Sequence, residues 1–401
     1  MMSARTRLFV ALVSTGVIGY LALGALLGRV MGDNSYGQLA VFNEVVRLVI
    51  DGYVDPIEID RPLAAADRGL LEALDGDSAY LDSETLRRYK DSSMQGDADI
   101  GVELSRRFGF LMVVAARPGS PAEEAGLRPG DIIKTIDGVH TRPLSGPAGQ
   151  HLLHGEPGSM LELTILRAGI DPLDLSVTRE RITDTPVQSR AIGDDIGYIR
   201  LSEFTPDSGD QVSGEIELLR RAGAGKLVLD LRSAAFGDPA DGVGVAELFV
   251  GDGVLARRAG RNVAEQVWKA DPEKVVWDGP LAALVDTGTA GPGEIVAAAL
   301  FYAKRAELVG RHTFGRAAIQ KLLPLPDGAL LLTVAQYTAG DGTSIHGAGL
   351  APTVPVEEAI PDDLDEEAEP AAARDDILDA AVEHLRAPAE GVEEEALDPA
   401  A

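Results

Sequence analysis

The side chains that could carry out chemistry are few and limited in type. His151 and His154 stand three residues apart, a spacing that could bring two imidazoles to one metal ion. No third ligand lies near them in the sequence, so surface histidines are the favoured interpretation, and we predict neither a metal nor a cofactor. The chain has no cysteine, which excludes disulfides, thiolate nucleophiles and cysteine-ligated metals.

A second feature is the turn Gly-Thr-Ala-Gly-Pro-Gly-Glu at residues 288–294. Gly291 can cap a helix, and Pro292 suits the first helical position, where no backbone N–H is required. We therefore predict that a helix begins here. Neither Gly291 nor Pro292 carries a reactive side chain, so the turn is typical of a structural helix start.

The composition limits what surrounds these residues. The chain has 401 residues, 45% of them hydrophobic, which is enough for two or three domains with real cores. Its formal net charge of −28 argues against a nucleic-acid partner, because a phosphate backbone is bound by clustered lysines and arginines.

The N-terminus predicts a membrane anchor. Arg5 and Arg7 precede an apolar run from Leu8 to Gly28, which Arg29 closes. About 20 such residues span a bilayer as a helix, whereas the apolar region of a cleaved signal peptide has roughly 7–15. We therefore favour an uncleaved single-pass anchor within residues 1–33. The positive-inside rule then places the bulk of the chain in the periplasm, or otherwise outside the cytoplasmic (inner) membrane.

Residues 34–95 predict a helical region. Apolar side chains recur there at three- and four-residue spacing, beginning at Phe42 and Val45. Two more helical stretches follow at Leu63–Leu74 and Ser83–Tyr89.

Residues 96–182 change to short apolar strands separated by Gly and Pro turns, which predicts a small β-barrel with two helices. The expected strands are Ile100–Leu104, Phe110–Ala115, Asp131–Ile136 and Leu161–Leu166, and the expected helices are Pro121–Ala125 and Pro147–Leu153.

Residues 183–356 alternate strands with helices, which predicts an α/β core with crossover connections and a largely buried sheet. The expected strands are Ile196–Leu201, Lys226–Leu231, Leu281–Asp286 and one starting at Leu308–Val309, and the expected helices are Ser208–Arg221, Gly242–Phe249 and Glu294–Arg305.

Residues 357–401 are acidic and rich in Ala and Pro, so we predict a largely disordered tail. One amphipathic helix at Asp375–Arg386 is compatible with the pattern. A last helix of the core and a docking helix for a partner are the alternatives for this segment.

The stretch from Gly119 to Ile133, followed by Ile136-Asp-Gly138, resembles the central segment of PDZ domains in bacterial proteases. PDZ domains bind a peptide C-terminus as an added strand and hold its carboxylate with backbone amides of a loop. Where the family usually has a glycine pair, this chain has Ala98-Asp99, which puts a carboxylate beside a carboxylate site. By resemblance, the peptide-binding residues are Ile100, Gly101, Val102, Glu103 and His151.

Further motifs lie at Tyr53–Pro56, Leu74–Leu81, Ile196–Leu201, Leu229–Arg232, Thr289-Ala290 with Glu294–Leu300, Gly310–Gly315 with Gln320, and Gly347–Pro352. In this order they resemble the carboxyl-terminal processing proteases, S41 serine peptidases that combine a PDZ domain with a ClpP/crotonase-like α/β core. The resemblance covers most of the chain.

The resemblance implies a Ser–Lys catalytic pair, and this chain lacks both members. The nucleophile position falls on Gly291, and the base position falls on Arg316. A guanidinium has a pKa above about 12 and cannot become a neutral base. Gln320, at the position that orients the lysine in the family, is retained.

The oxyanion hole implied by the resemblance is also incomplete. One donor would be the backbone N–H of the residue after the nucleophile, here Pro292, which has none. The other comes from a Pro-Gly-Gly loop, which here reads Ser233-Ala-Ala-Phe236-Gly237. Loss of one oxyanion donor typically costs about 10²–10³ in rate.

Three functions remain open. The first is a non-catalytic, membrane-anchored module that binds polypeptide C-termini or a partner protein. The second is a serine-type endopeptidase with relocated catalytic groups, for which Thr289, Thr287 and Ser233 are the hydroxyls and Lys304 and Lys321 the amines. The third is a structural subunit, in a homo- or hetero-oligomer, of a membrane-associated protease or assembly complex.

Overall fold

The computed structural model describes residues 34–92, 98–357 and 375–387. The predicted anchor at residues 1–33 lies outside the described residues, as does most of the predicted tail. Within the described part, no helix is both long enough and apolar enough to cross a bilayer.

The chain forms two units, residues 1–66 and 67–401. The first unit contains α2 (Asn34–Gly52) and the start of α3 (Asp60–Glu72), which confirms the helical pattern predicted here. Large apolar side chains along α2, Phe42 among them, are exposed.

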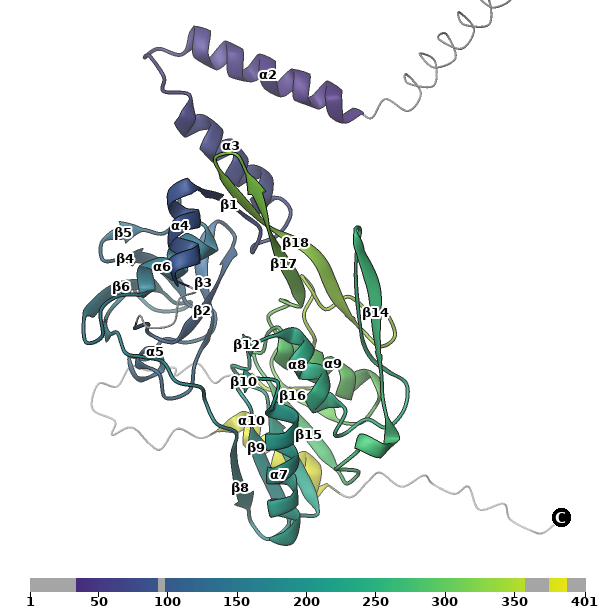
Figure 1. The fold of residues 1–401 in the computed structure, drawn as a ribbon. Helices are drawn as coiled ribbons and strands as arrows, with labels where there is room; N and C mark the ends of the chain where they lie inside the picture. The colour runs from purple at the N-terminus through teal and green to yellow at the C-terminus, as the bar shows by residue number, and fades with distance from the viewer. Residues whose placement is uncertain (1–33, 93–97, 358–374, 388–401) are drawn as a thin grey trace, which may run out of the picture. The chain divides into compact units, whose positions relative to one another are not determined.

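In the second unit, an antiparallel sheet runs in the order β2-β3-β4-β6-β7, with β5 against β4 (Figure 1). Leu111, Ile133 and Ile165 lie in its buried core. The four predicted strands and both predicted helices are confirmed, and β7 is an additional strand. The elements are β2 (Val102–Arg107), β3 (Phe110–Ala116), α5 (Pro121–Glu124), β4 (Ile132–Ile136), β5 (Val139–His140), α6 (Gly146–Leu153), β6 (Met160–Leu166) and β7 (Leu173–Thr178).

A six-stranded sheet follows in the order β19-β16-β15-β11-β9-β8, and all its pairs are parallel except β8 with β9. It confirms the predicted α/β core. A short parallel pair, β10 with β12, lies outside this sheet. The elements are β8 (Gln188–Ile192), β9 (Ile196–Arg200), β10 (Glu203–Phe204), α7 (Ser208–Arg221), β11 (Lys226–Asp230), β12 (Phe236–Gly237), α8 (Pro239–Ala246), η1 (Pro272–Lys274), β15 (Leu281–Val285), α9 (Pro292–Tyr302), β16 (Glu307–Gly310) and β19 (Val354–Pro355).

A third sheet is antiparallel and was not predicted. Its order is β1-β18-β13-β14, with β17 also paired to β18. Strand β1 comes from the region predicted to be helical, and that prediction is wrong there because Leu81 is fully buried and the strand pairs with distant β18. The elements are β1 (Ala79–Asp82), followed by α4 (Ser83–Ser92), then β13 (Val254–Gly260), β14 (Val263–Lys269), β17 (Ala318–Leu325) and β18 (Gly328–Ala339).

Both faces of the parallel sheet are covered. On β11, Leu227 and Leu229 pack with α7, α8 and α9, whereas Val228 packs with Ile377 of α10 (Asp376–Arg386). Alternate residues of a strand point to opposite faces, so α10 closes the second face. The amphipathic helix considered at Asp375–Arg386 is thereby confirmed as α10. It is the last helix of the core, the less favoured alternative to a tail segment, because a parallel sheet is buried on both sides.

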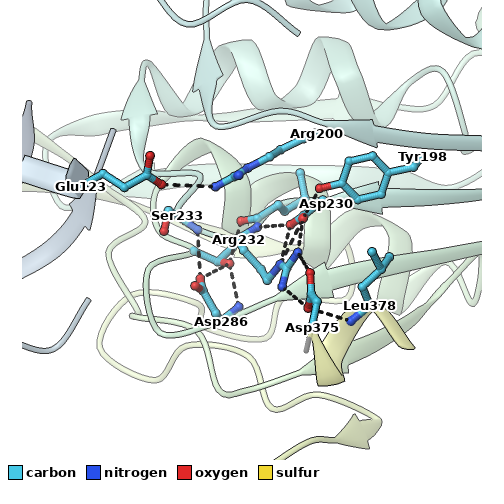
Figure 2. Close-up of polar contacts among 11 residues, drawn as sticks. Glu123, Tyr198, Arg200, Asp230, Arg232, Ser233, Asp286, Asp375 and Leu378 are labelled. Carbon is cyan, nitrogen blue, oxygen red and sulfur yellow. Dashed lines mark hydrogen bonds and ion pairs between the residues drawn. The ribbon is translucent and has the colours of Figure 1, made fainter. Parts of the chain in front are cut away.

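An ion-pair network fastens the start of α10 (Figure 2). Arg232 donates to both carboxylate oxygens of Asp375, at 2.7 and 2.9 Å, and also contacts buried Asp230. Asp230 accepts the Tyr198 hydroxyl at 2.7 Å, and Asp375 caps α10 by accepting the Leu378 N–H at 3.1 Å. Burial alone would lower the pKa of Arg232, but its two carboxylate partners raise it.

Candidate functional site

The turn before α9 is built around Gly291. This glycine caps the helix with φ 53° and ψ −115°, and Pro292 is the first helical residue, as predicted. An added Cβ at Gly291 would lie 3.6 Å from the Arg316 carbonyl oxygen, an ordinary contact. The turn therefore has room for a side chain, although its positive φ favours glycine.

A buried glutamate, Glu294, holds this turn against the next loop. Its Oε1 accepts the Thr313 hydroxyl at 2.5 Å and the Gly315 N–H at 2.7 Å, and its Oε2 accepts the N–H groups of Arg316 and Gly291 at 2.8 and 3.2 Å. Burial raises the pKa of Glu294, while these donors oppose the shift. The sequence analysis missed this role, although a Glu in the first turn after a capping residue is a recognisable capping-box signal.

Arg316, which the resemblance predicts at the base position, is held by two carboxylates. Its Nε is 3.3 Å from Asp77 Oδ2, and its Nη1 donates to Glu103 Oε1. Burial alone would lower the pKa of Arg316, but Asp77 and Glu103 outweigh it and raise the pKa above its ordinary value. The side chain is therefore a fixed cation and cannot accept a proton.

Gln320 is used for structure in this chain. Its Nε2 donates to the Asp77 carbonyl oxygen at 2.6 Å, while Asp77 Oδ1 accepts the Ser105 hydroxyl at 2.8 Å. The positions of the base and of its orienting residue thus join β17 to the segment before β1 and to strand β2. No local sequence signal identifies Asp77, because its partners are far away along the chain.

A cleft of about 330 Å³ lies beside Gly291. Arg316 forms part of its wall, and Phe236 is absent from the residues that line it, so the cleft is open. Three carboxylates and one guanidinium face it, which makes it acidic. The described lining consists of Asp77, Glu103, Ala235, Gly237, Asp238, Pro239, Gly291, Pro292, Arg316, Ala318, Ile319, Gln320 and Thr333.

The loop implied for the oxyanion hole is packed tightly. Phe236 is buried, and the Arg117 guanidinium lies 4.4 Å from the centre of its ring. Gly237 has φ 110°, and a Cβ there would lie 2.0 Å from the Phe204 carbonyl oxygen. Pro292 has no N–H to offer, so one of the two expected donors is missing from the site.

The hydroxyl next to the turn, Thr289, is fully buried and already bonded. Its Oγ1 donates to the Leu231 carbonyl oxygen at 2.8 Å and accepts the Asp286 N–H at 3.0 Å. Asp286 also accepts the Ser233 N–H at 3.0 Å, as Figure 2 shows. Burial raises the pKa of Asp286. This arrangement stabilises the loop and uses the Thr289 hydroxyl in two hydrogen bonds of the fold.

The residues predicted to bind a peptide fall at the edge strand β2 and at α6. Ile100 is buried, and Val102 and Glu103 begin β2, but the Glu103 side chain pairs with Arg316. On α6, Gln150, which directly precedes His151, donates to the Val102 carbonyl oxygen at 2.9 Å. The peptide-binding role of His151 stays a prediction.

Metal binding finds no support in this geometry. Within residues 34–92, 98–357 and 375–387, no group of three or more His, Cys, Asp or Glu side chains is arranged to hold an ion. His154 instead lies 3.8 Å from Asp99 Oδ2.

Comparison with known proteins places these observations in a family. The peptidase family S41 model matches residues 195–356, and a PDZ domain model matches residues 112–167. A carboxy-terminal-processing protease of Bartonella bacilliformis is 32% identical, with 82% of this chain and 77% of that protein covered. The carboxy-terminal processing protease CtpA of Bacillus subtilis is 28% identical, with 88% and 77% covered.

A solved structure has the same architecture. The photosystem II D1 C-terminal processing protease superposes with a TM-score of 0.67 at 28% identity, covering 79% of this chain and 92% of that one. The resemblance read from the motifs is thereby confirmed. The chain belongs to peptidase family S41, is a homologue of the carboxyl-terminal processing proteases, and carries a PDZ domain.

Proposed function

We propose that this protein is a membrane-anchored, non-catalytic member of its family that binds polypeptides, whether C-termini or partner proteins, through its PDZ domain. The single observation that carries the proposal is the state of the cleft beside Gly291. There the nucleophile position has no side chain, and the base position is a guanidinium paired with Asp77 and Glu103.

The loss of chemistry extends beyond these two positions. Acyl transfer requires a nucleophile, a base able to accept its proton, and donors for the oxyanion. Gly291 has no side chain to serve as the nucleophile, and Arg316 cannot accept a proton as the base. Pro292 has no N–H, so one donor for the oxyanion is missing. Buried Thr289 donates its only hydroxyl hydrogen to a backbone carbonyl, so it supplies no replacement nucleophile.

Binding is supported by what remains. The PDZ domain has the fold that recognises extended peptides. The cleft is open and has space for a short stretch of extended chain. The apolar run at Leu8–Gly28, with Arg5 and Arg7 before it, supports the membrane anchor and an extracytoplasmic location.

The test uses the purified full-length chain and fluorescein-labelled unfolded casein. We expect the anisotropy of the label to rise on binding, while gel electrophoresis shows the casein intact. The matched control is Thr289→Ala. Cleavage by the wild-type chain that disappears in this variant would show a relocated nucleophile and overturn the proposal, and absence of both binding and cleavage would count against polypeptide binding.

The anchor is tested separately. A fusion reporter that is active only in the periplasm, placed after Ala401, is expected to be active in cells and to sediment with membranes. An inactive reporter on a fusion that is produced intact would contradict the proposed orientation.

A further inference from the structure

The loop that leads into β2 of the PDZ domain has a fixed backbone. The Ile100 carbonyl oxygen accepts the Ala122 N–H at 2.9 Å, and the Gly101 carbonyl oxygen accepts the Arg117 N–H at 2.7 Å. Gly101 has φ 81°, and a Cβ there would lie 2.4 Å from the Ser120 Cβ, so only glycine fits. The backbone shape of a carboxylate-binding loop is therefore retained.

Strand β2 is an edge strand, paired only with β3 in its sheet. Successive residues of an antiparallel strand direct their backbone groups to alternate edges. Because Gly101 is bonded on the inner side through Arg117, Val102 directs its carbonyl oxygen to the outer edge. A peptide added to the sheet would bond along this outer edge, with its terminal carboxylate at the loop amides.

The loop amides are already occupied by a side chain of the same chain. Asp99 Oδ1 accepts the Ile100 N–H and, at 3.4 Å, the Gly101 N–H. The Asp99 backbone is itself anchored, because it exchanges two hydrogen bonds with Glu180, at 2.8 and 2.9 Å. The Asp99 carboxylate thus lies where the carboxylate of a peptide terminus would lie.

The outer edge of β2 is occupied at its two ends as well. Gln150 Nε2 donates to the Val102 carbonyl oxygen at 2.9 Å, in place of the backbone N–H of a last peptide residue. Farther along, the Arg106 N–H donates to the Gly76 carbonyl oxygen at 3.3 Å. Asp99 and Gln150 together therefore reproduce the carboxylate and the N–H of a bound terminal residue.

We infer that Asp99 and Gln150 are specificity-determining residues that exclude a free C-terminal carboxylate from the PDZ domain, so that its ligand is an internal extended segment. A terminal carboxylate would meet a second carboxylate at amides that are already used, and like charges at contact distance repel. An internal segment has no terminal charge and needs neither amide. This inference rests on the proposed polypeptide binding and narrows its ligand class.

The test compares two probes on the full-length chain by fluorescence anisotropy. Both are the same fluorescein-labelled random hexapeptide pool, once with a free C-terminal acid and once amidated. We expect the wild-type chain to bind the amidated pool at least as tightly as the acid pool. In Asp99→Gly/Gln150→Ala, we expect affinity for the acid pool to rise by about tenfold, since a vacated amide pair gains a charged acceptor.

One single variant isolates the charge of Asp99 and replaces the double variant should that fail to fold. Asp99→Asn keeps the size and the acceptor oxygen but removes the charge, so it should recover part of the gain. Asp174→Asn, on strand β7, where Asp174 accepts the Thr164 hydroxyl at 2.8 Å, is the matched control and should leave both affinities unchanged.

Preference of the wild-type chain for the acid pool by about tenfold or more would overturn the inference. Failure of every Asp99 and Gln150 variant to gain acid-pool affinity would overturn it too. If the wild-type chain binds neither pool while a variant gains the acid pool, the exclusion of a terminal carboxylate by Asp99 and Gln150 stands, and polypeptide binding by the wild-type PDZ domain falls, together with the internal segment as its ligand.

Discussion

The cleft beside Gly291 and the loop before β2 both lie where the family resemblance places function, and they differ in what occupies them. The cleft has a volume of about 330 Å³, and no side chain stands at Gly291, the position predicted for the nucleophile. The loop keeps its backbone amides, but the Asp99 carboxylate already occupies two of them. The first site is open, and the second is occupied by a side chain of the same chain.

The difference shows which parts of a site the fold itself needs. Glu294 joins the turn at Gly291 to the loop at Arg316. A buried carboxylate with four donors cannot be removed without leaving those donors unsatisfied. The shape of the cleft therefore depends on Glu294 and not on the residue types at the positions predicted for catalysis.

The largest expected effect is the loss of stability on removing Glu294, which joins the two loops beside the cleft. Glu294→Ala should lower the free energy of unfolding by about 3–5 kcal/mol, because it leaves the Thr313 hydroxyl and three backbone N–H groups without their acceptor. Urea unfolding followed by circular dichroism measures it. Glu307→Ala, at an exposed position of β16, is the control and should change stability by less than about 0.5 kcal/mol. A loss below about 1 kcal/mol for Glu294→Ala would mean that the cleft is not held by this residue.

The second effect concerns Arg316, the cation at the position predicted for the base. Arg316→Ala should cost about 2–3 kcal/mol, less than a fully buried pair, because it leaves Asp77 and Glu103 close together without a counter-charge. Arg316→Lys should cost less than Arg316→Ala because it retains the charge. It should still be less stable than wild type, since an ammonium cannot reproduce the two-sided contact of a guanidinium.

Thermal unfolding of both variants measures this effect. Arg221→Ala, which breaks an exposed i,i+4 pair with Glu217, serves as the control and should cost no more than about 0.5 kcal/mol. Equal stability of Arg316→Ala and wild type would show that the ion pairs do not stabilise the junction.

A smaller effect on stability is expected from the ion pair of Arg232 and Asp375. Burial alone would raise the pKa of Asp375, but Arg232 lowers it below the ordinary value of 3.8. A carboxylate with a depressed pKa contributes stability above its unfolded pKa and loses it as the pH falls through the folded one. Asp375→Asn, which keeps a good helix cap, should therefore cost about 1 kcal/mol at pH 7 after allowance for solvent screening.

The measurement is the stability difference between wild type and Asp375→Asn from pH 7 downward. The difference should shrink as the pH falls below the ordinary value of 3.8. A difference that stays constant across this range would show that the charge of Asp375 does not hold α10.

The smallest expected effect comes from adding a side chain at Gly291. Gly291→Ser should destabilise the chain by about 1 kcal/mol, because its φ of 53° is unfavourable for a residue with a Cβ. It should not produce hydrolysis of labelled casein, since Arg316 remains charged and Pro292 still lacks an N–H. Turnover by this single variant, absent from Gly291→Ala, would contradict the interpretation of the cleft.

Much of the fold was predictable because its signals are local. The helix start at Gly291-Pro292, the alternation of strands and helices after residue 183, and the PDZ strands all follow from short patterns that the structure confirms. Strand β7 was missed although its apolar residues Leu173, Leu175 and Val177 alternate with polar ones, the pattern of a half-buried strand. Strand β1 was missed because its four residues become a strand only through pairing with β18.

The sequence predicted which catalytic residue types are missing from the candidate site, but it did not predict the contacts that the remaining residues make. The residue types at Gly291, Pro292 and Arg316 alone predict that the expected chemistry is absent. The partners of Arg316, by contrast, come from segments far away in the sequence, Asp77 before β1 and Glu103 in β2. No periodicity or spacing relates such residues, so only the folded chain brings them together.

By itself, the sequence determined the family and most elements of the PDZ domain and of the α/β core, and it predicted the loss of the nucleophile and base, because each depends on the identity of residues within short motifs. The tertiary structure decided that the cleft stays open, that α10 completes the core, and that Asp99 and Gln150 occupy the PDZ loop and its strand edge. These outcomes depend on distances between segments, which are set by packing and long-range pairing and are not encoded in any one stretch of the chain.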